Sequence, residues 1–222
     1  MGRLQQSVRL ALRRRAVAGD LDEDGSPDLL LGDRTSRATR YLGAPQGDLV
    51  ARPRLASGTT PSAAPQAVRL RDLDGDGRDD LVFANIRGPD TVYLAGNGGF
   101  AGSSPVNGTD SADVVAADLD GDGDLDLAFA TRPVSAEGDA GNPVYTNNGS
   151  GSFTLAERLG NLPSDDILAA DFNDDGSPDL LFVSSTGIQQ VYDGTPSGFV
   201  LADEQMVSPG ALGAATGEFS QE

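Results

Sequence analysis

The chain has 222 residues, 38% of them hydrophobic, and carries a formal charge of −18 with neither cysteine nor histidine. These counts exclude disulfides, thiol catalysis, zinc–thiolate sites and a Ser-His-Asp relay, and the negative charge disfavours binding along a nucleic-acid phosphate backbone. No apolar run approaches the roughly 20 residues of a membrane helix, and 29 Gly with 13 Pro favour many short turns.

The first fifteen residues contain five arginines and no acidic residue. Val8, Leu10 and Leu12 alternate with arginine or alanine, which favours a strand. A transit peptide or a lipid-contacting segment is the alternative interpretation. The segment lacks the roughly 7–15-residue apolar core of a secretory signal peptide.

Four acidic nonapeptides follow at spacings of 52, 46 and 53 residues and hold 19 of the 34 acidic residues. They are DLDEDGSPD from Asp20, DLDGDGRDD from Asp72, DLDGDGDLD from Asp118 and DFNDDGSPD from Asp171. Short apolar runs flank each nonapeptide, and a tyrosine-bearing run and a further run after a turn complete each unit. Such runs between turn signals predict strands rather than helices.

Four short strands in a unit of about 50 residues are typical of a propeller blade. We therefore expect an all-β fold, a β-propeller of four four-stranded blades at approximately 16–62, 63–111, 112–163 and 164–209. Residues 1–15 would be the outer strand of a preceding blade, and residues 210–222 the start of a fifth. This organisation favours an open arc of a larger ring within a longer chain, and a compact ring of four or five blades is the alternative.

Two segments depart from the repeat. The tyrosine of the third unit stands about six residues late, which places an insertion at Arg132–Gly141; its composition predicts a long loop, either a recognition loop or a tolerated surface insertion. Arg69 and Arg71 replace apolar or small residues of the other units. They would either contact an anionic ligand in a central channel or pair with neighbouring aspartates, which better suits the guanidinium fork.

The nonapeptides share the pattern D-x-[DN]-x-D-G-x-x-D. Carboxylate or amide oxygens at positions 1, 3 and 5, a backbone carbonyl at position 7 and a carboxylate at position 9 converge when the chain curls, and Ca²⁺ prefers six or seven such oxygens. The glycine at position 6 permits the sharp turn. Mg²⁺ is the second choice. An EF-hand is excluded because position 12 is Leu or Phe and both flanks predict strands. Solvated Asp/Gly turns are the alternative without a ligand.

The nonapeptides, with NNGSGSFT at Asn147–Thr154, resemble the FG-GAP repeats of integrin alpha-chain propellers and the related VCBS-type repeats. The resemblance implies a propeller, usually of seven blades, with mainly structural Ca²⁺ in the loop between the first two strands of a blade. It implies up to four ions. The ligands it implies are Asp20, Asp22, Asp24, the Ser26 carbonyl and Asp28; Asp72, Asp74, Asp76, the Arg78 carbonyl and Asp80; Asp118, Asp120, Asp122, the Asp124 carbonyl and Asp126; and Asp171, Asn173, Asp175, the Ser177 carbonyl and Asp179.

We expect a non-enzymatic, calcium-binding module for adhesion or recognition, located outside the cell or on its surface. Its partners would be a protein or glycan ligand on the loop faces and the remaining blades of a longer chain, without nucleic acid or a membrane span. The propeller portion of a secreted polysaccharide lyase or hydrolase is the alternative. An intracellular calcium sensor is a third hypothesis, which predicts helices that open on binding.

Overall fold

The computed structural model describes residues 16–22, 24–32, 38–43, 50–52, 64–86, 88–96, 99–106, 110–132 and 141–206, and these residues form strands and turns without a helix. The strands are β1 (Ala16–Gly19), β2 (Asp28–Gly32), β3 (Ala38–Leu42), β4 (Val50–Arg52), β5 (Ala64–Arg71), β6 (Asp80–Ile86), β7 (Asp90–Gly96), β8 (Gly99–Val106), β9 (Ser111–Ala117), β10 (Asp126–Thr131), β11 (Asn142–Asn147), β12 (Phe153–Leu159), β13 (Asp166–Ala170), β14 (Asp179–Val183), β15 (Ile188–Thr195) and β16 (Gly198–Met206).

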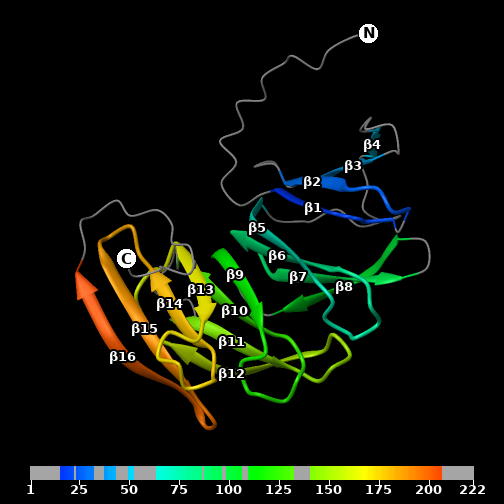
Figure 1. The fold of residues 1–222 in the computed structure, drawn as a ribbon. Helices are drawn as coiled ribbons and strands as arrows, with labels where there is room; N and C mark the ends of the chain where they lie inside the picture. The colour runs from blue at the N-terminus through cyan, green and yellow to red at the C-terminus, as the bar shows by residue number, and fades with distance from the viewer. Residues whose placement is uncertain are drawn as a thin grey trace, which may run out of the picture.

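The strands form four antiparallel sheets, each built from four consecutive strands in chain order. The sheets succeed one another around an arc with β1–β4 and β13–β16 at its two ends (Figure 1). The first strands β1, β5, β9 and β13 contact their neighbours in the next sheet, so they line the inner side of the arc. This architecture confirms the predicted all-β propeller of four-stranded blades. The expected strands at 1–15 and 210–222 lie outside the described residues, and the blade boundaries stay predictions.

Every sheet repeats the same register between its second and third strands. The tyrosine of the third strand pairs with the leucine that follows the nonapeptide, as in Leu81↔Tyr93 and Leu180↔Tyr192. In three sheets this tyrosine also meets a phenylalanine edge to face: the ring centroids of Phe83 and Tyr93 are 5.6 Å apart at an interplanar angle of 83°. Phe129–Tyr145 and Phe182–Tyr192 repeat this geometry. The aromatic period of the sequence therefore marks the interior of each blade.

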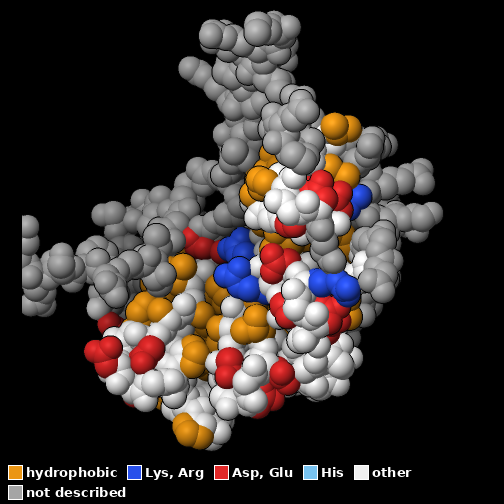
Figure 2. Space-filling view, turned by 45° about the vertical axis from the view of Figure 1, so that its right-hand side comes forward, with side chains coloured by type: hydrophobic (Ala, Val, Ile, Leu, Met, Phe, Trp, Pro, Cys, Tyr) orange, Lys and Arg blue, Asp and Glu red, His pale blue; other side chains and the backbone are white. Residues whose placement is uncertain are grey.

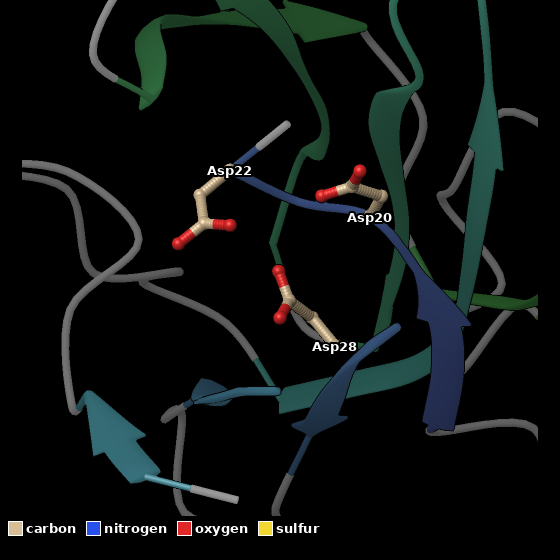
Figure 3. Close-up of side chains that lie close together, drawn as sticks. All are labelled: Asp20, Asp22 and Asp28. Carbon is tan, nitrogen blue, oxygen red and sulfur yellow. The ribbon is translucent and has the colours of Figure 1, made fainter. Parts of the chain in front are cut away.

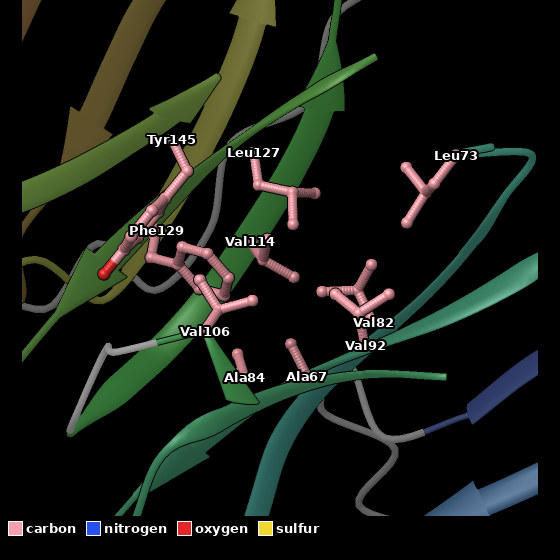
Figure 4. Close-up of a cluster of buried hydrophobic side chains, with 10 residues drawn as sticks. All are labelled: Ala67, Leu73, Val82, Ala84, Val92, Val106, Val114, Leu127, Phe129 and Tyr145. Atoms are coloured by element: carbon pink, nitrogen blue, oxygen red, sulfur yellow. The ribbon is translucent and has the colours of Figure 1, made fainter. Parts of the chain in front are cut away.

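The hydrophobic core lies between consecutive sheets as three separate clusters. The second cluster joins Leu73 and Val82 of the second sheet to Val114, Phe129 and Tyr145 of the third (Figure 4). Since a single four-stranded sheet cannot enclose a core, each blade is stabilised by its neighbours.

The predicted insertion falls between β10 and β11. Its first and last residues, Arg132 and Gly141, are described, whereas residues 133–140 lie outside the described residues. In the ranges that the structure describes, no helix is long and apolar enough to cross a membrane.

Candidate metal centres

Each acidic nonapeptide forms the loop between the first and second strands of its sheet, as the sequence predicted. The glycine at position 6 has a left-handed backbone in all four loops, with φ of 83° at Gly25, 88° at Gly77, 98° at Gly123 and 91° at Gly176. An L-residue with a side chain rarely adopts this conformation, so glycine is required for the reversal. The reversal brings the carboxylates of the loop to one side.

The carboxylate at position 1 organises the loop by accepting backbone hydrogen bonds. Asp72 accepts from the N–H groups of Gly75 at 2.8 Å and Gly77 at 2.9 Å. Asp20, Asp118 and Asp171 each accept two bonds in the same way. These bonds hold the loop curled around its own carboxylates, and they leave further lone pairs of those oxygens available to a cation.

Three of the four loops gather three carboxylates into a group that could hold a metal ion. In each group one oxygen from every residue lies within 4.8 Å of the others; the groups are Asp20, Asp22 and Asp28; Asp72, Asp74 and Asp80; and Asp118, Asp120 and Asp122. Figure 3 shows the first group, with the carboxylates of Asp20, Asp22 and Asp28 turned toward a shared space. All donors are hard oxygens, which suits Ca²⁺ or Mg²⁺ and not a soft transition metal.

Each group contains three of the ligands predicted for its loop, and the groups differ from one another in their third member. Position 9 completes the first two groups, whereas Asp122 at position 5 completes the third. In the fourth loop an asparagine, Asn173, stands at position 3. The side-chain oxygens that this loop offers to a cation are therefore the amide oxygen of Asn173 and the carboxylates of Asp171, Asp175 and Asp179. The complete ligand sets, including the carbonyls at position 7, stay a prediction.

The carboxylate at position 9 has a second role that the sequence analysis missed. Asp80 Oδ2 accepts the N–H of Leu73 at 2.8 Å, and its Oδ1 accepts the N–H of Ala95 in β7 at 2.7 Å. The other sheets repeat these two bonds, with Asp28 accepting from Leu21 and Gly43, Asp126 from Leu119 and Asn147, and Asp179 from Phe172 and Gly194. This buried carboxylate therefore fastens the acidic loop to the third strand.

Desolvation is the largest cause of the raised pKa at three carboxyl groups of these loops, those of Asp22, Asp80 and Asp126. Desolvation raises the pKa of Asp80 to about 6, although the N–H groups of Ala95 and Leu73 oppose the shift. Desolvation likewise raises the pKa of Asp126, and it raises that of Asp22 together with the charges of Asp28 and Asp24. In the fourth loop, the hydrogen bond from the Ser177 N–H lowers the pKa of Asp175. A bound cation would favour the ionised form of every group named here.

In all four loops, the backbone N–H of the residue at position 7 donates a hydrogen bond to the carboxylate at position 5. In the second loop the residue at position 7 is Arg78, whose Nη1 also donates to Asp76 Oδ2 at 2.9 Å. This ion pair places a positive charge on one predicted ligand. Acidic side chains lie in separate groups across the face shown in Figure 2, with basic side chains between them.

Arg69 pairs with an aspartate, which was the interpretation favoured by the sequence. Its Nη2 donates to Asp113 Oδ1 of β9 at 2.6 Å, so the bond joins the inner strands of the second and third sheets. The neighbouring Arg71 is exposed and donates to the carbonyl of Leu70 at 2.8 Å.

Two buried polar pairs between sheets also escaped the sequence analysis. Asp90 Oδ1 accepts the N–H of Asn85, and its Oδ2 accepts the hydroxyl of Ser111 in the next sheet at 2.6 Å. One sheet later, Asn142 Oδ1 accepts the N–H of Thr131, and its Nδ2 donates to Ser164 Oγ at 3.1 Å. A serine seven residues before the third and fourth nonapeptides was the available signal.

A family model described as FG-GAP-like repeat matches residues 20–83 and 72–129 of this chain. Among solved structures, the chain is similar to BBS1N in two crystal structures of its complex with ARL6DN, one soaked with lead and one with mercury, at 13% sequence identity in both. The TM-scores are 0.57 and 0.56, and the matches cover 88% and 87% of this chain but only 57% and 53% of those chains. The chain thus spans little more than half the length of these relatives, and the likeness is one of fold. No curated protein matches the chain.

Proposed function

This chain is an FG-GAP repeat protein, and on that premise we propose that its acidic loops bind up to four Ca²⁺ ions that mainly stabilise the propeller. The observation that carries the proposal is the convergence of three carboxylates within 4.8 Å in each of three loops. Three like charges at this separation repel one another, and a divalent cation converts the repulsion into attraction. The binding free energy would then contribute directly to folding.

Calcium is preferred to magnesium because of the number and variety of oxygens in each loop. Carboxylates alternate with backbone groups over nine residues, and three or four carboxylates of each loop accept backbone hydrogen bonds that fix their positions. Such a site supplies many oxygens at uneven angles, which Ca²⁺ accepts and Mg²⁺ does not. Extracellular modules bind Ca²⁺ with Kd on the order of 10⁻⁴–10⁻³ M, which suits millimolar calcium outside cells.

Calorimetric titration of the chelator-treated chain with CaCl₂ tests this proposal. We expect up to four sites in the wild type and one site fewer in Asp74→Ala, which removes position 3 of the second loop. Asp203→Ala is the matched control, because it removes the same carboxylate from an exposed position on β16. Equal heats for all three proteins, or no uptake by the wild type, would contradict calcium binding.

We further propose that the module recognises a protein or glycan ligand through its loop faces and acts outside the cell or on its surface, without catalysis. The BBS1N propeller to which the chain is similar was crystallised in complex with a protein, ARL6DN, which supports a protein partner for a fold of this kind. Burial raises the pKa of Asp90 to about 7, as in a general acid, but Asp90 is fully buried and cannot touch a substrate, so it is not a candidate catalytic residue.

Binding and cleavage assays on the same ligands separate this proposal from the carbohydrate-active alternative. We expect the calcium-loaded chain to be retained on an immobilised polysaccharide or extracellular protein without releasing reducing ends. Release of unsaturated or reducing sugar products would establish an enzyme instead. Protease treatment of intact producing cells tests the location, since an intracellular chain would survive it.

A further inference from the structure

A pocket of about 390 Å³ opens between the third and fourth sheets, where β12 lies beside the hairpin of β15 and β16 (Figure 1). Its apolar lining includes the buried Leu119 and Val144 and the half-buried Phe199. Its polar lining includes Thr146 and Glu157. A mainly apolar hollow with a few polar groups is the usual form of a ligand site.

The pocket belongs to an interface whose two sides, β9–β12 and β13–β16, are both described. A further blade would pack on an end of the arc and would therefore leave this place open. The pocket adjoins a second one of about 350 Å³ between the third and fourth acidic loops, with which it shares Leu119 and Asp120. A ligand that lies on these loops can therefore reach into it.

The pocket is open because the third sheet lacks a leucine that the second sheet has. Leu94 follows the tyrosine of the second sheet and packs against the second core cluster. A Cβ atom at Gly151, in the turn between β11 and β12, would lie 2.7 Å from Leu94 Cδ2, so the turn of the next sheet lies directly on this leucine. The shorter Thr146 stands at the same position of the third sheet. The turn of the fourth sheet lies on Glu157 instead, since a Cβ atom at Gly198 would be 2.6 Å from Glu157 Oε1.

Glu157 gives the pocket a charge that nothing in its lining balances. Its Oε1 accepts the N–H of Phe199 at 3.1 Å, and its side chain is half-buried. One hydrogen bond leaves other lone pairs of the carboxylate available, and within the described ranges Glu157 forms no ion pair. The described lining holds one further acidic residue, Asp120, and no basic residue. Because partial burial of an unpaired carboxylate is costly, a positive group is the complement that this pocket lacks.

We infer that the pocket takes a long basic side chain, arginine or lysine, that a protein partner presents. Its alkyl stem would lie on Val144 and Phe199, in the place that Leu94 takes in the second sheet, and its cationic head would pair with Glu157. A neutral saccharide would leave Glu157 without a cation. The inference rests on the proposed recognition role, whose ligand it narrows to a protein, and it does not depend on calcium binding.

Nuclear magnetic resonance titration with n-butylguanidinium, which reproduces the arginine side chain, tests the site. High ionic strength screens non-specific attraction to a chain of charge −18. We expect saturable shifts of the amide signals of Thr146, Glu157 and Phe199, and severalfold weaker binding of N-butylurea, which has a similar shape without the charge. No saturable shift with n-butylguanidinium, or equal binding of N-butylurea, would overturn the inference. Shifts with methyl glucoside alone would assign the pocket to a glycan and overturn it as well.

Two variants test the two parts of the pocket. Thr146→Leu fills it as Leu94 does in the second sheet and should abolish binding; Ala156→Leu, from the pocket side of β12, replaces it if circular dichroism shows that Thr146→Leu does not fold. Glu157→Gln keeps an acceptor for the N–H of Phe199 but removes the charge, so the affinity should fall severalfold. Glu204→Gln on the exposed end of β16 is the matched control and should bind as the wild type does. Unchanged binding by the filled variant, or equal losses in both glutamine variants, would contradict the site.

Retention on immobilised extracellular proteins separates this inference from the proposed function. We expect a retained wild type and a released Thr146→Leu variant. Equal retention of both would mean that another surface recognises the partner, which overturns the inference and leaves the proposed function in place. Binding of n-butylguanidinium by a chain that no extracellular protein retains would contradict the recognition role and, with it, the protein partner.

Discussion

Asp90 and Asn142 make the same bonds in successive sheets, but only one of them can carry a charge. Each accepts a backbone N–H from its own sheet and contacts a serine hydroxyl of the next sheet. Desolvation raises the pKa of Asp90 to about 7, and the charge of Asp110 adds to the shift. Between the ordinary Asp pKa of about 3.9 and about 7, the folded state binds more protons than the unfolded state. The contribution of Asp90 to stability is therefore greatest at low pH and declines as the pH rises through this window.

Asp90→Asn should remove this pH dependence while keeping both bonds, because the amide can donate to Ser111 as Asn142 donates to Ser164. We expect the free energy of unfolding of the variant to exceed that of the wild type by on the order of 1–3 kcal/mol at pH 8 and by much less at pH 5. Urea unfolding at the two pH values measures the difference. The reverse change, Asn142→Asp, should lose stability at pH 8. Parallel pH profiles for the wild type and Asp90→Asn would contradict the argument.

Arg78 is the only arginine at position 7 of a nonapeptide, where the other loops have Ser or Asp. Its Nη1 lies 2.9 Å from Asp76 Oδ2, and both side chains are about one-third exposed. Arg78→Ser should raise the Ca²⁺ affinity of the second loop severalfold, since an exposed ion pair of this kind is worth about 0.2–1 kcal/mol and competes with the cation. Competition with a chromophoric chelator measures the affinity. Arg158→Ser, which removes the same charge from β12, should leave it unchanged.

At the scale of the strands, the loop and the third strand constrain each other. A Cβ atom at Gly194 would lie 2.2 Å from the carbonyl oxygen of Pro178, and one at Gly43 would lie 2.3 Å from that of Pro27. The two sheets without proline at position 8 of the nonapeptide have Ala95 and Asn147 in place of these glycines. Proline in the loop therefore occurs together with glycine at the end of the third strand, where the two backbones approach closely.

Gly194→Ala should consequently destabilise the fourth sheet by about 1–3 kcal/mol through steric overlap with a backbone atom. Denaturant unfolding followed by circular dichroism measures the loss. The control is Ala95→Gly in the second sheet, whose cost should be limited to backbone entropy, about 0.5–1 kcal/mol. An unchanged stability of Gly194→Ala would contradict the argument, because it would mean that the Pro178 carbonyl moves aside without cost.

At the scale of the whole molecule, 19 of the 34 acidic residues crowd into four loops of a chain with a formal charge of −18. Four bound Ca²⁺ ions would bring eight positive charges to the places where repulsion is strongest. Binding at each site raises the free energy of unfolding by RT ln(1 + [Ca²⁺]/Kd), which is about 1 kcal/mol when the Ca²⁺ concentration exceeds Kd severalfold.

Millimolar CaCl₂ should therefore raise the Tm by more than NaCl at the same ionic strength, and EDTA should reverse the gain. Sodium chloride screens the charges without occupying the loops, so it measures the screening contribution alone. MgCl₂ at equal concentration should stabilise less than CaCl₂. Equal shifts with all three salts would mean that the loops respond to screening and not to a bound ion.

The sequence by itself determined the repeat, the strand order and the acidic loops, because these depend on local patterns. Alternating apolar runs specify strands, glycine at position 6 specifies a left-handed turn, and the aromatic period specifies which side of a strand faces the core. Asp20, Asp72, Asp118 and Asp171 could be placed at loop starts from spacing alone. The FG-GAP resemblance rested on the same local patterns.

Only the tertiary structure decided what joins one sheet to another. The hydrogen bond that Ser111 donates to Asp90 and the one that Arg69 donates to Asp113 link residues 21 and 44 positions apart. They join β9 to β7 and to β5, and they exist because the arc packs the second sheet against the third. The same holds for Phe172, which occupies the position of three buried leucines and yet is 44% exposed. Local sequence assigns a residue to a face of its strand, but whether that face is covered depends on which sheet packs against it.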